Sequence, residues 1–369
     1  MMITAGNGFI EQSDRYAFNN AGESLKKYIL LERGELAYNH GASKLRPYGS
    51  CFALTTVEKA RIPFVYHCFS VEKSNPEFLS IELNGANVEN QLRKIVSSGA
   101  RMDGLLNIAY SEYTEVTVQL PKKEEQDWIA KFFKHLDTLI TLHQRKYEKL
   151  VNIKKSMLDK MFPKNGASVP EIRFKGFTDL WEQRKLEEYL EVSGQKNFEG
   201  IYTKEDVLSV SGDFGIVNQI EFQGRSFAGA SVANYGVVET GDIVYTKSPL
   251  KSNPYGIIKA NKGKNGIVST LYAVYKPKQS ANPEFVQIYF EQDARMNNYM
   301  HPLVNKGAKN DMKVSAENAL KGQIVFPDIK EQRTISEFFR NLDTLITLHQ
   351  RKLEKLQNIK KSCLEKMFV

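Results

Sequence analysis

The side chains best suited to metal binding or nucleophilic chemistry are few and scattered in this chain. The three cysteines, Cys51, Cys68 and Cys363, are odd in number and have no metal-ligand spacing. They predict reduced thiols in a cytoplasmic protein. The histidines are equally dispersed, at His40, His67, His135, His143, His301 and His349. We therefore predict neither a metal site nor a cofactor.

Two Asn-Pro-Glu-Phe segments, at 75–78 and 282–285, are the best candidates for catalytic chemistry, together with Asn253-Pro254-Tyr255. They are similar to the Asn-Pro-Pro-Tyr/Phe motif of adenine methyltransferases, but they lack its second proline. No glycine-rich cofactor loop follows a strand, and the sequence contains no Walker A motif. We predict that the chain is not an enzyme and that any catalysis comes from partners.

The charge balance bounds the kind of partner. The chain has 51 Lys+Arg against 43 Asp+Glu, a formal net charge of +8, which suits a polyanion without requiring one. No run of about 18 apolar residues is present, and the first residues, MMITAGNGFIEQ, lack the basic and apolar regions of a signal peptide. We expect a cytoplasmic protein with no membrane partner.

One segment occurs twice in the sequence, and we expect it to position the functional groups. Residues 132–162 and 338–368 are identical at 25 of 31 positions, at a constant offset of 206, which indicates an internal repeat. Apolar residues recur in steps of three or four, without Gly or Pro, and predict one long helix per copy, over 124–161 in the first. Such a helix is about 57 Å long. Its stripe is too narrow for an ordinary core helix, which favours an antiparallel coiled coil of the two copies.

The stripes of both helices are predicted to form the coiled coil or to bind partners. His143 and His349 are equivalent, and a polar residue there more often fixes register than binds metal. Tyr147 and Leu353 differ between the copies and are interpreted as outward residues. The predicted interface comprises Phe132, Leu136, Leu139, His143, Tyr147, Leu150, Ile153, Met157, Phe338, Leu342, Leu345, His349, Leu353, Leu356 and Ile359.

A fainter repeat extends upstream of each helix. Matched segments are 120–129 with 326–335, 75–78 with 282–285, 47–49 with 254–256, and Tyr38 with Tyr245. Runs rich in Val, Ile, Tyr and Thr, such as 230–247 and 265–275, predict strands, whereas 282–297 predicts a helix. The fold class is therefore α/β, with two similar α/β parts related by a pseudo-two-fold internal repeat.

The predicted domains follow from this repeat. They are a first α/β domain over 1–121, a helix and linker over 122–169, a second α/β domain over 170–329 and a C-terminal helix over 330–369. The second half opens with PEIRFKGFTDLWEQRKLEEYLE at 170–191, predicted as a loop and an amphipathic helix. The first half lacks such a lead-in, and we expect an N-terminally shortened chain.

The lead-in, the PxxxEQxxI start of each helix and the repeated FFxxLDxLIxLHQRKxEKL helices resemble the specificity subunit of type I restriction-modification systems. In that family two target recognition domains are held apart by two antiparallel helices, and each domain reads half of a bipartite DNA site. The resemblance implies a host-defence role and three kinds of partner. These are double-stranded DNA, two modification methyltransferase subunits and restriction subunits.

Bases are read by polar side chains on loops that can enter the major groove. Given the resemblance, the candidate loops are those after the matched tyrosines and those just before the return to each helix. The candidate DNA-binding residues are Asn39, Ser43, Lys44, Arg46 and Arg101 in the first half, and Lys247, Ser248, Lys251, Asn253, Lys309 and Asn310 in the second.

Two alternatives stay open at this point. The chain could be a coiled-coil scaffold that binds no DNA, or it could be an inactive truncated allele, because the missing lead-in departs from the family pattern. Salt-dependent binding to duplex DNA separates a recognition subunit from a scaffold.

Overall fold

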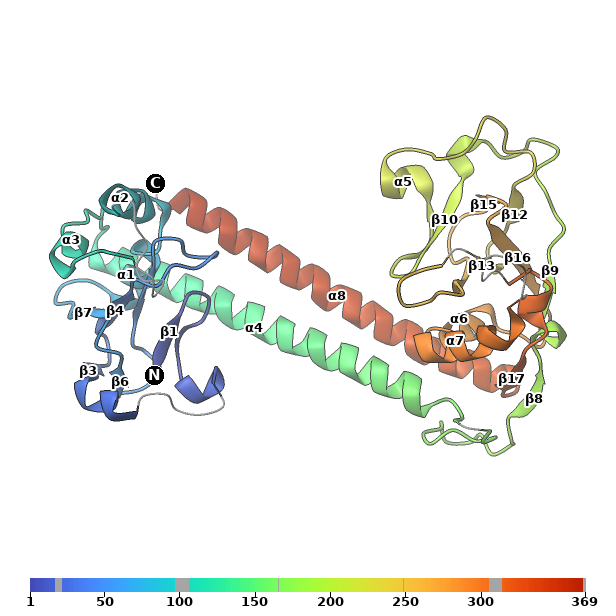
Figure 1. The fold of residues 1–369 in the computed structure, drawn as a ribbon, viewed down its shortest axis with the longest axis horizontal. Coiled ribbons are helices and arrows are strands. Elements are labelled where there is room, and N and C mark those ends of the chain that lie inside the picture. The colour runs from blue at the N-terminus through green and yellow to red at the C-terminus, as the bar shows by residue number, and fades with distance from the viewer. Residues whose placement is uncertain (17–21, 97–105, 165, 248, 305–313, 368–369) are drawn as a thin grey trace. The chain divides into compact units, whose positions relative to one another are not determined.

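The computed structural model describes residues 1–16, 22–96, 106–164, 166–247, 249–304 and 314–367. The chain divides into two compact units: unit 1 is Met1–Arg145 with His349–Val369, and unit 2 is Lys146–Leu348. Two long helices, α4 (Lys123–Lys160) and α8 (Ile329–Met367), each contribute to both units (Figure 1). The helix predicted over 124–161 is confirmed to within one residue at either end. Among the described residues, no helix is long and apolar enough to cross a membrane.

Within each unit the two helix segments run in opposite directions. In unit 1 the ammonium group of Lys360 lies 2.5 Å from the Asp137 carboxylate, and in unit 2 the ammonium group of Lys154 lies 2.7 Å from the Asp343 carboxylate. These are the same contact made once in each unit, since the paired positions differ by 206. The repeated sequence therefore repeats a specific helix contact.

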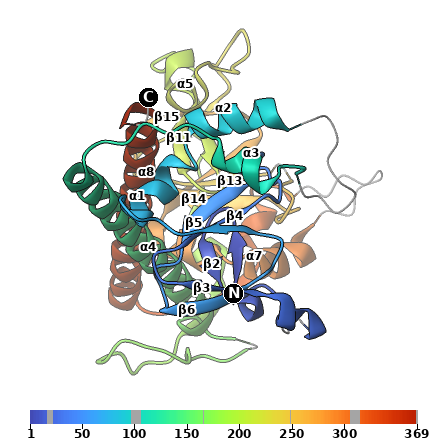
Figure 2. The same ribbon diagram turned by 90° about the vertical axis from the view of Figure 1, so that its left-hand side faces the viewer.

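Unit 1 is built on a three-stranded antiparallel sheet with the order β5-β4-β7. Leu36 of β4 lies opposite Ala53 of β5 and Phe69 of β7, and α1 packs against β5 (Figure 2). Two further antiparallel pairs are β1-β2 and β3-β6. The elements are β1 (Met2–Thr4), β2 (Gly8–Ile10), β3 (Ile29–Glu32), β4 (Leu36–Asn39), β5 (Ser50–Ala53), β6 (Lys59–Ile62), β7 (His67–Phe69), α1 (Pro76–Glu82), α2 (Ala86–Ile95) and α3 (Tyr110–Thr114).

Unit 2 contains the corresponding sheet with one more strand, in the order β14-β13-β16-β9. A separate pair, β8-β17, lies next to the start of α8, and the two strands run side by side (Figure 1). The remaining pairs are β10-β11 and β12-β15. The elements are β8 (Glu182–Lys185), β9 (Leu190–Val192), β10 (Leu208–Ser211), β11 (Gly215–Asn218), β12 (Gly236–Val238), β13 (Ile243–Thr246), β14 (Ile257–Ala260), β15 (Gly266–Val268), β16 (Tyr272–Pro277), β17 (Gln323–Phe326), α5 (Gln219–Gln223), α6 (Pro283–Tyr289) and α7 (Asp293–Met300).

Two predicted helices are wrong in detail. The lead-in, predicted to end in an amphipathic helix, forms β8, a 3-10 turn at Leu186–Glu188 and β9. Strand pairing with β17 and β16 overrides the helix propensity of its Glu, Gln, Arg and Lys residues. The single helix predicted over 282–297 is in fact two helices, since α6 ends at Tyr289 and α7 begins at Asp293.

Candidate nucleic-acid interface

The Asn-Pro-Glu-Phe segments cap helices. Asn75 and Asn282 are the N-cap residues of α1 and α6, and their side-chain oxygens accept hydrogen bonds from the backbone N–H of Phe78 and Phe285. The proline that follows occupies the first helical turn, where its missing N–H costs nothing. The motif is thus explained by local structure, and these asparagines are engaged with the backbone.

The glutamines of the two PxxxEQ sequences join these caps to the long helices. The side-chain oxygen of Gln126 accepts a hydrogen bond from the Asn75 backbone N–H at 2.8 Å, and that of Gln332 accepts one from Asn282 at 2.9 Å. Both glutamines are buried. The sequence signature at each helix start therefore fastens the helix to the α/β part of its unit.

The candidate loop after each matched tyrosine is held in the same way in both units. Tyr38 donates a hydrogen bond to the Tyr48 carbonyl, and Tyr245 donates one to the Tyr255 carbonyl, both at 2.6 Å. Burial raises the pKa of both tyrosines well above its ordinary value. The next residue, Gly256, has φ +85° and lies so close to Thr246 that a Cβ would overlap its carbonyl oxygen. Each loop is thus tied to its strand by an equivalent tyrosine hydrogen bond.

Arg46 and Asn253 are equivalent residues of these loops, and both turn inward. The Arg46 guanidinium donates to the Asn84 carbonyl, which follows α1, and burial lowers the pKa of Arg46. The side-chain amide of Asn253 donates to Asp293, at the start of α7, at 2.6 Å. Each residue therefore ties its loop to the same helix junction, which is a positioning role.

Lys44 and Lys251 are also equivalent, and they are exposed. No hydrogen bond or ion pair of either ammonium group is found within the part of the chain that the structure describes. Exposed leucines accompany them, since Leu45 is 64% and Leu250 41% exposed. Of the candidate residues that the structure describes, these two lysines are the ones that are exposed and make no hydrogen bond or ion pair there, as a phosphate-binding residue would.

The remaining candidates fall into two groups. Asn39 donates to the Ile3 carbonyl at 3.2 Å, Ser43 accepts from the Arg46 backbone N–H, and Lys247 donates to the Thr270 carbonyl at 3.1 Å, so all three make local contacts. Burial, more than the nearby Lys196, lowers the pKa of Lys247. The other group lies outside the described residues and comprises Arg101, Ser248, Lys309 and Asn310.

Unit 2 exposes aromatic rings, one of them beside an arginine, that the sequence reasoning missed. Phe214 is 67% exposed and Phe227 56% exposed, and the Arg225 guanidinium lies 4.6 Å from the centre of the Phe227 ring. Exposed aromatic rings beside arginine are a common arrangement in nucleic-acid-binding surfaces. The signal was present as phenylalanines at 214, 222 and 227 in a stretch otherwise rich in Gly and polar residues.

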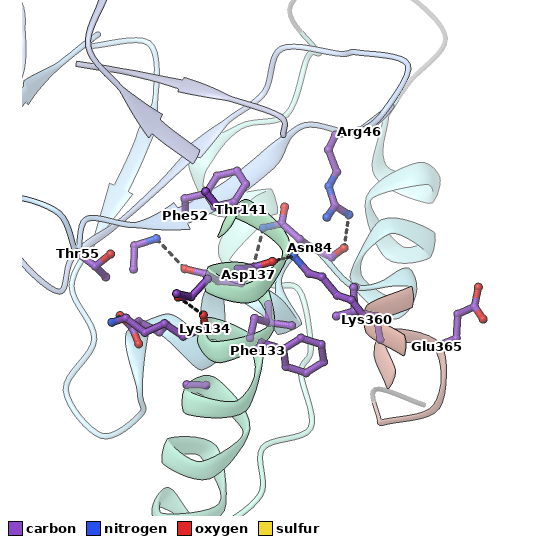
Figure 3. Close-up of a pocket in the computed structure, with 18 of the residues that line it drawn as sticks. Arg46, Phe52, Thr55, Asn84, Phe133, Lys134, Asp137, Thr141, Lys360 and Glu365 are labelled. Atoms are coloured by element: carbon purple, nitrogen blue, oxygen red, sulfur yellow. Dashed lines mark hydrogen bonds and ion pairs between the residues drawn. The ribbon is translucent and has the colours of Figure 1, made fainter. Parts of the chain in front are cut away.

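A hollow of about 870 Å³ lies in unit 1 between α1, β5 and the helix segments (Figure 3). Its charged lining is largely paired, because Lys360 binds Asp137 and Lys134 binds Glu77 at 2.6 Å. Phe52 occupies the position that Lys259 holds in unit 2, where the burial of Lys259 lowers its pKa. Within the described residues, no group of three or more His, Cys, Asp or Glu side chains could hold a metal ion.

The predicted interface residues of the two helices fall into two sets by exposure. The seam residues are those that are buried or partly buried, and they are Leu136, His143, Tyr147, Leu150, Ile153, Met157, Phe338, Leu342, His349, Leu353, Leu356 and Ile359. Leu353 is 8% exposed, so its prediction as an outward residue is wrong. Tyr147 is only partly exposed. The exposed set is Phe132, Leu139 and Leu345, at 42%, 41% and 45%.

The two seam histidines contact one another. Their Nδ1 atoms lie 2.8 Å apart, so one ring donates a hydrogen bond and the other accepts it.

Leu142 and Leu348, each 45% exposed, extend the exposed set on the outer surface. Both helices therefore carry a matched pair of exposed leucines, Leu139 with Leu142 and Leu345 with Leu348.

No protein-family model matches this sequence. The chain is 24% identical over 359 residues to a Methanocaldococcus jannaschii protein that bears the name of the MjaX type I restriction enzyme specificity subunit. This match covers 92% of the chain and 78% of that protein.

Solved structures of type I S subunits resemble the chain as well. The S subunit from M. genitalium aligns with a TM-score of 0.51 and 14% identity, over 93% of this chain and 85% of that one. The HsdS subunit from Thermoanaerobacter tengcongensis aligns with a TM-score of 0.44 and 17% identity, over 92% and 81%. The first alignment shows a shared fold. The resemblance to the specificity subunits of type I restriction-modification systems is confirmed, because the chain is similar in sequence to one that bears this name.

Proposed function

We propose that this chain is the DNA sequence-recognition subunit of a type I restriction-modification complex. The observation that carries the proposal is sequence similarity to a specificity subunit along 92% of the chain. In this proposal, residues 1–121 and 170–329 are two target recognition domains, and each reads one half of a bipartite, interrupted duplex site. Because the two α/β parts differ in sequence, the site is asymmetric.

The long helices are proposed to act as the frame of the complex. Their opposite directions within each unit and their buried seam support an antiparallel coiled coil over 122–169 and 330–369. The exposed leucine pairs offer equivalent apolar contacts on both helices, which suits the docking of two methyltransferase subunits. Restriction subunits join through that core, and the partners supply catalysis, so the chain itself needs no cofactor.

DNA contacts are proposed for the exposed residues of the candidate loops. Lys44 and Lys251 are assigned to phosphates, since they are exposed and equivalently placed. Arg225 with Phe227 is assigned to DNA contacts in unit 2 as well. Arg101, Ser248, Lys309 and Asn310 remain candidates for base contacts, whereas Arg46 and Asn253 are assigned to holding the loops.

Methylome mapping tests this function directly. The chain is co-expressed with its methyltransferase subunit in a host that lacks adenine methylation, and methylated adenines are mapped across the genome. A bipartite interrupted motif is expected. If the complex co-purifies but no motif appears, recognition by this chain is refuted; if no complex forms, a scaffold that binds no DNA is favoured instead.

A further inference from the structure

Unit 2 is completed by the segment 170–192. This segment supplies β8, which pairs with β17, and β9, which pairs with β16. Its Arg173 donates to both carboxylate oxygens of Glu331 at 2.7 Å. Its Trp181 is 2% exposed and packs edge-on against Phe285. The segment therefore contributes two strand pairings, a buried ion pair and a buried indole ring.

Two of the residues that contact this segment in unit 2 have exposed counterparts in unit 1. Residues 117–120 correspond to β17, yet they form no strand in the described ranges. Leu120 is 44% exposed, whereas its counterpart Phe326 is 1% exposed. Glu125, the counterpart of Glu331, is exposed, and no ion pair to its carboxylate occurs within the described residues.

The second strand pairing is open as well. β7 holds the place of β16, because Phe69 of β7 lies opposite Leu36 as Tyr275 of β16 lies opposite Ile243. In unit 2 the sheet continues from β16 to β9, whereas among the described strands of unit 1 the sheet ends at β7. A sheet edge of this kind accepts an added strand through main-chain hydrogen bonds.

A hollow of about 290 Å³ lies beside the open residues, and its lining includes Phe78, Leu120 and Glu125. Phe78 is the counterpart of Phe285, against which Trp181 packs in unit 2. The apolar side chains of Leu120, Ile129 and Met367 line it beside the carboxylates of Glu82 and Glu125. This chemistry suits an aromatic side chain on a segment that also carries an arginine.

We propose that unit 1 binds a polypeptide segment from outside residues 1–369 with the chemistry of residues 170–192. It provides an arginine for Glu125, an aromatic ring for the hollow, and two short strands, for 117–120 and β7. The same segment of a second copy is a poor occupant. It already buries Trp181 and Leu190 in its own unit 2, so an exchange would open as much surface as it covers.

A peptide titration tests the proposal on the full chain. A fluorescein-labelled peptide with the sequence of residues 169–193, VPEIRFKGFTDLWEQRKLEEYLEVS, is titrated with the protein and followed by anisotropy. We expect saturable binding of one peptide per chain. The Glu125→Arg variant should bind at least ~10-fold more weakly, because a charge-assisted pair is replaced by repulsion. A peptide carrying Arg173→Glu should regain affinity for that variant.

Glu124→Arg is the matched control, because Glu124 is an exposed neighbour and the substitution makes the same change of charge. It should leave the affinity unchanged. Absence of saturable binding up to about 1 mM peptide, or an equal loss in both variants, would overturn the proposal. Loss of binding in Glu331→Arg but not in Glu125→Arg would place the peptide in unit 2 and also overturn it. A protein dimer that the peptide dissociates would identify a second copy as the occupant instead.

Discussion

Glu125 and Glu331 occupy equivalent positions near the start of the two long helices, and their surroundings differ. Glu331 is 1% exposed and receives two hydrogen bonds from Arg173, whereas Glu125 is exposed. A buried carboxylate depends on its partner, because removal of one member of a buried pair leaves the other charge uncompensated. A glutamate at the same position therefore contributes differently to the stability of the two units.

Substitution of these two glutamates should affect the stability of the two units differently. Glu331→Gln should lower the free energy of unfolding of unit 2 by about 3 kcal/mol, since Arg173 would be left partly buried without its charge partner. Glu125→Gln should change stability by less than about 0.5 kcal/mol. Urea unfolding followed by circular dichroism measures both variants, and the fluorescence of Trp181, which is buried in unit 2, reports on that unit. Equal effects would contradict the assignment of a buried pair to unit 2.

Lys259 gives a prediction with a pH dependence. This residue of β14 is 9% exposed, and its burial lowers its pKa below the value of about 10.4 expected in the unfolded chain. Between those two pKa values the unfolded state binds more protons, so stability rises with pH through that window. Lys259→Met should therefore stabilise unit 2 at pH 7 by about 1 kcal/mol.

The comparison across pH supplies the control. The advantage of Lys259→Met over the unsubstituted chain should shrink as the pH rises towards about 10.4, because the unsubstituted lysine then loses its charge in the folded state. Urea unfolding at neutral and alkaline pH measures this difference. A gain that stays constant with pH would assign the effect to packing instead.

The exposed lysines of the candidate loops should act through phosphates. Lys44→Ala and Lys251→Ala should each weaken binding to all duplex sequences alike and reduce the salt slope of binding by about 1. Measurements at several salt concentrations, on specific and unrelated duplexes, test this. A change in the preferred bases would assign the lysine to base recognition.

For single residues, the sequence predicted which loops carry polar side chains but not the direction in which each side chain points. Lys44 and Arg46 are two residues apart in one loop, and only the fold shows that Lys44 faces solvent while Arg46 bonds to the Asn84 carbonyl. Direction in a loop depends on turn geometry and on distant partners, which no periodicity encodes. The exposed Phe214 and Phe227 were missed for the same reason, because phenylalanine by default predicts a core position.

Among the elements, the long helices were the easiest to predict. A stripe repeated over 38 residues, with no Gly or Pro, defined α4 to within one residue. The lead-in failed because its helix propensity is weaker than its pairing with β17 and β16, two strands that lie far along the chain. The predicted stripe includes Leu136 and Leu342, which are buried, and Leu139, which is exposed, since a stripe with steps of three or four leaves the exact face open.

The exposed leucines of the helices give a prediction on docking. Leu139→Glu and Leu345→Glu should leave the thermal stability nearly unchanged, because both side chains are exposed. They should reduce co-purification of the methyltransferase subunit, because a charge would be placed in an apolar contact. Asn152→Glu, an exposed polar position of α4, is the control and should retain the subunit. Retention by all three variants would exclude this face as the docking surface.

For the whole molecule, independent recognition by the two units predicts a change confined to one half of the site. Replacing residues 249–253, the loop of unit 2, with an unrelated sequence of equal length should alter one half of the methylated motif. The other half should stay intact, because residues 40–49 of unit 1 are unchanged. Methylome mapping of the variant measures this. Alteration of both halves would contradict separate recognition.

The division of the chain also has a consequence for protein synthesis. Unit 2 is one continuous stretch, Lys146–Leu348, whereas unit 1 joins Met1–Arg145 to His349–Val369. The ribosome therefore synthesises all of unit 2 before the last part of unit 1 exists, a delay of roughly 10–40 s at 5–20 residues per second. Throughout that interval Asp137 has no Lys360 to bind. Nascent unit 1 should thus be the part of the chain that chaperones protect.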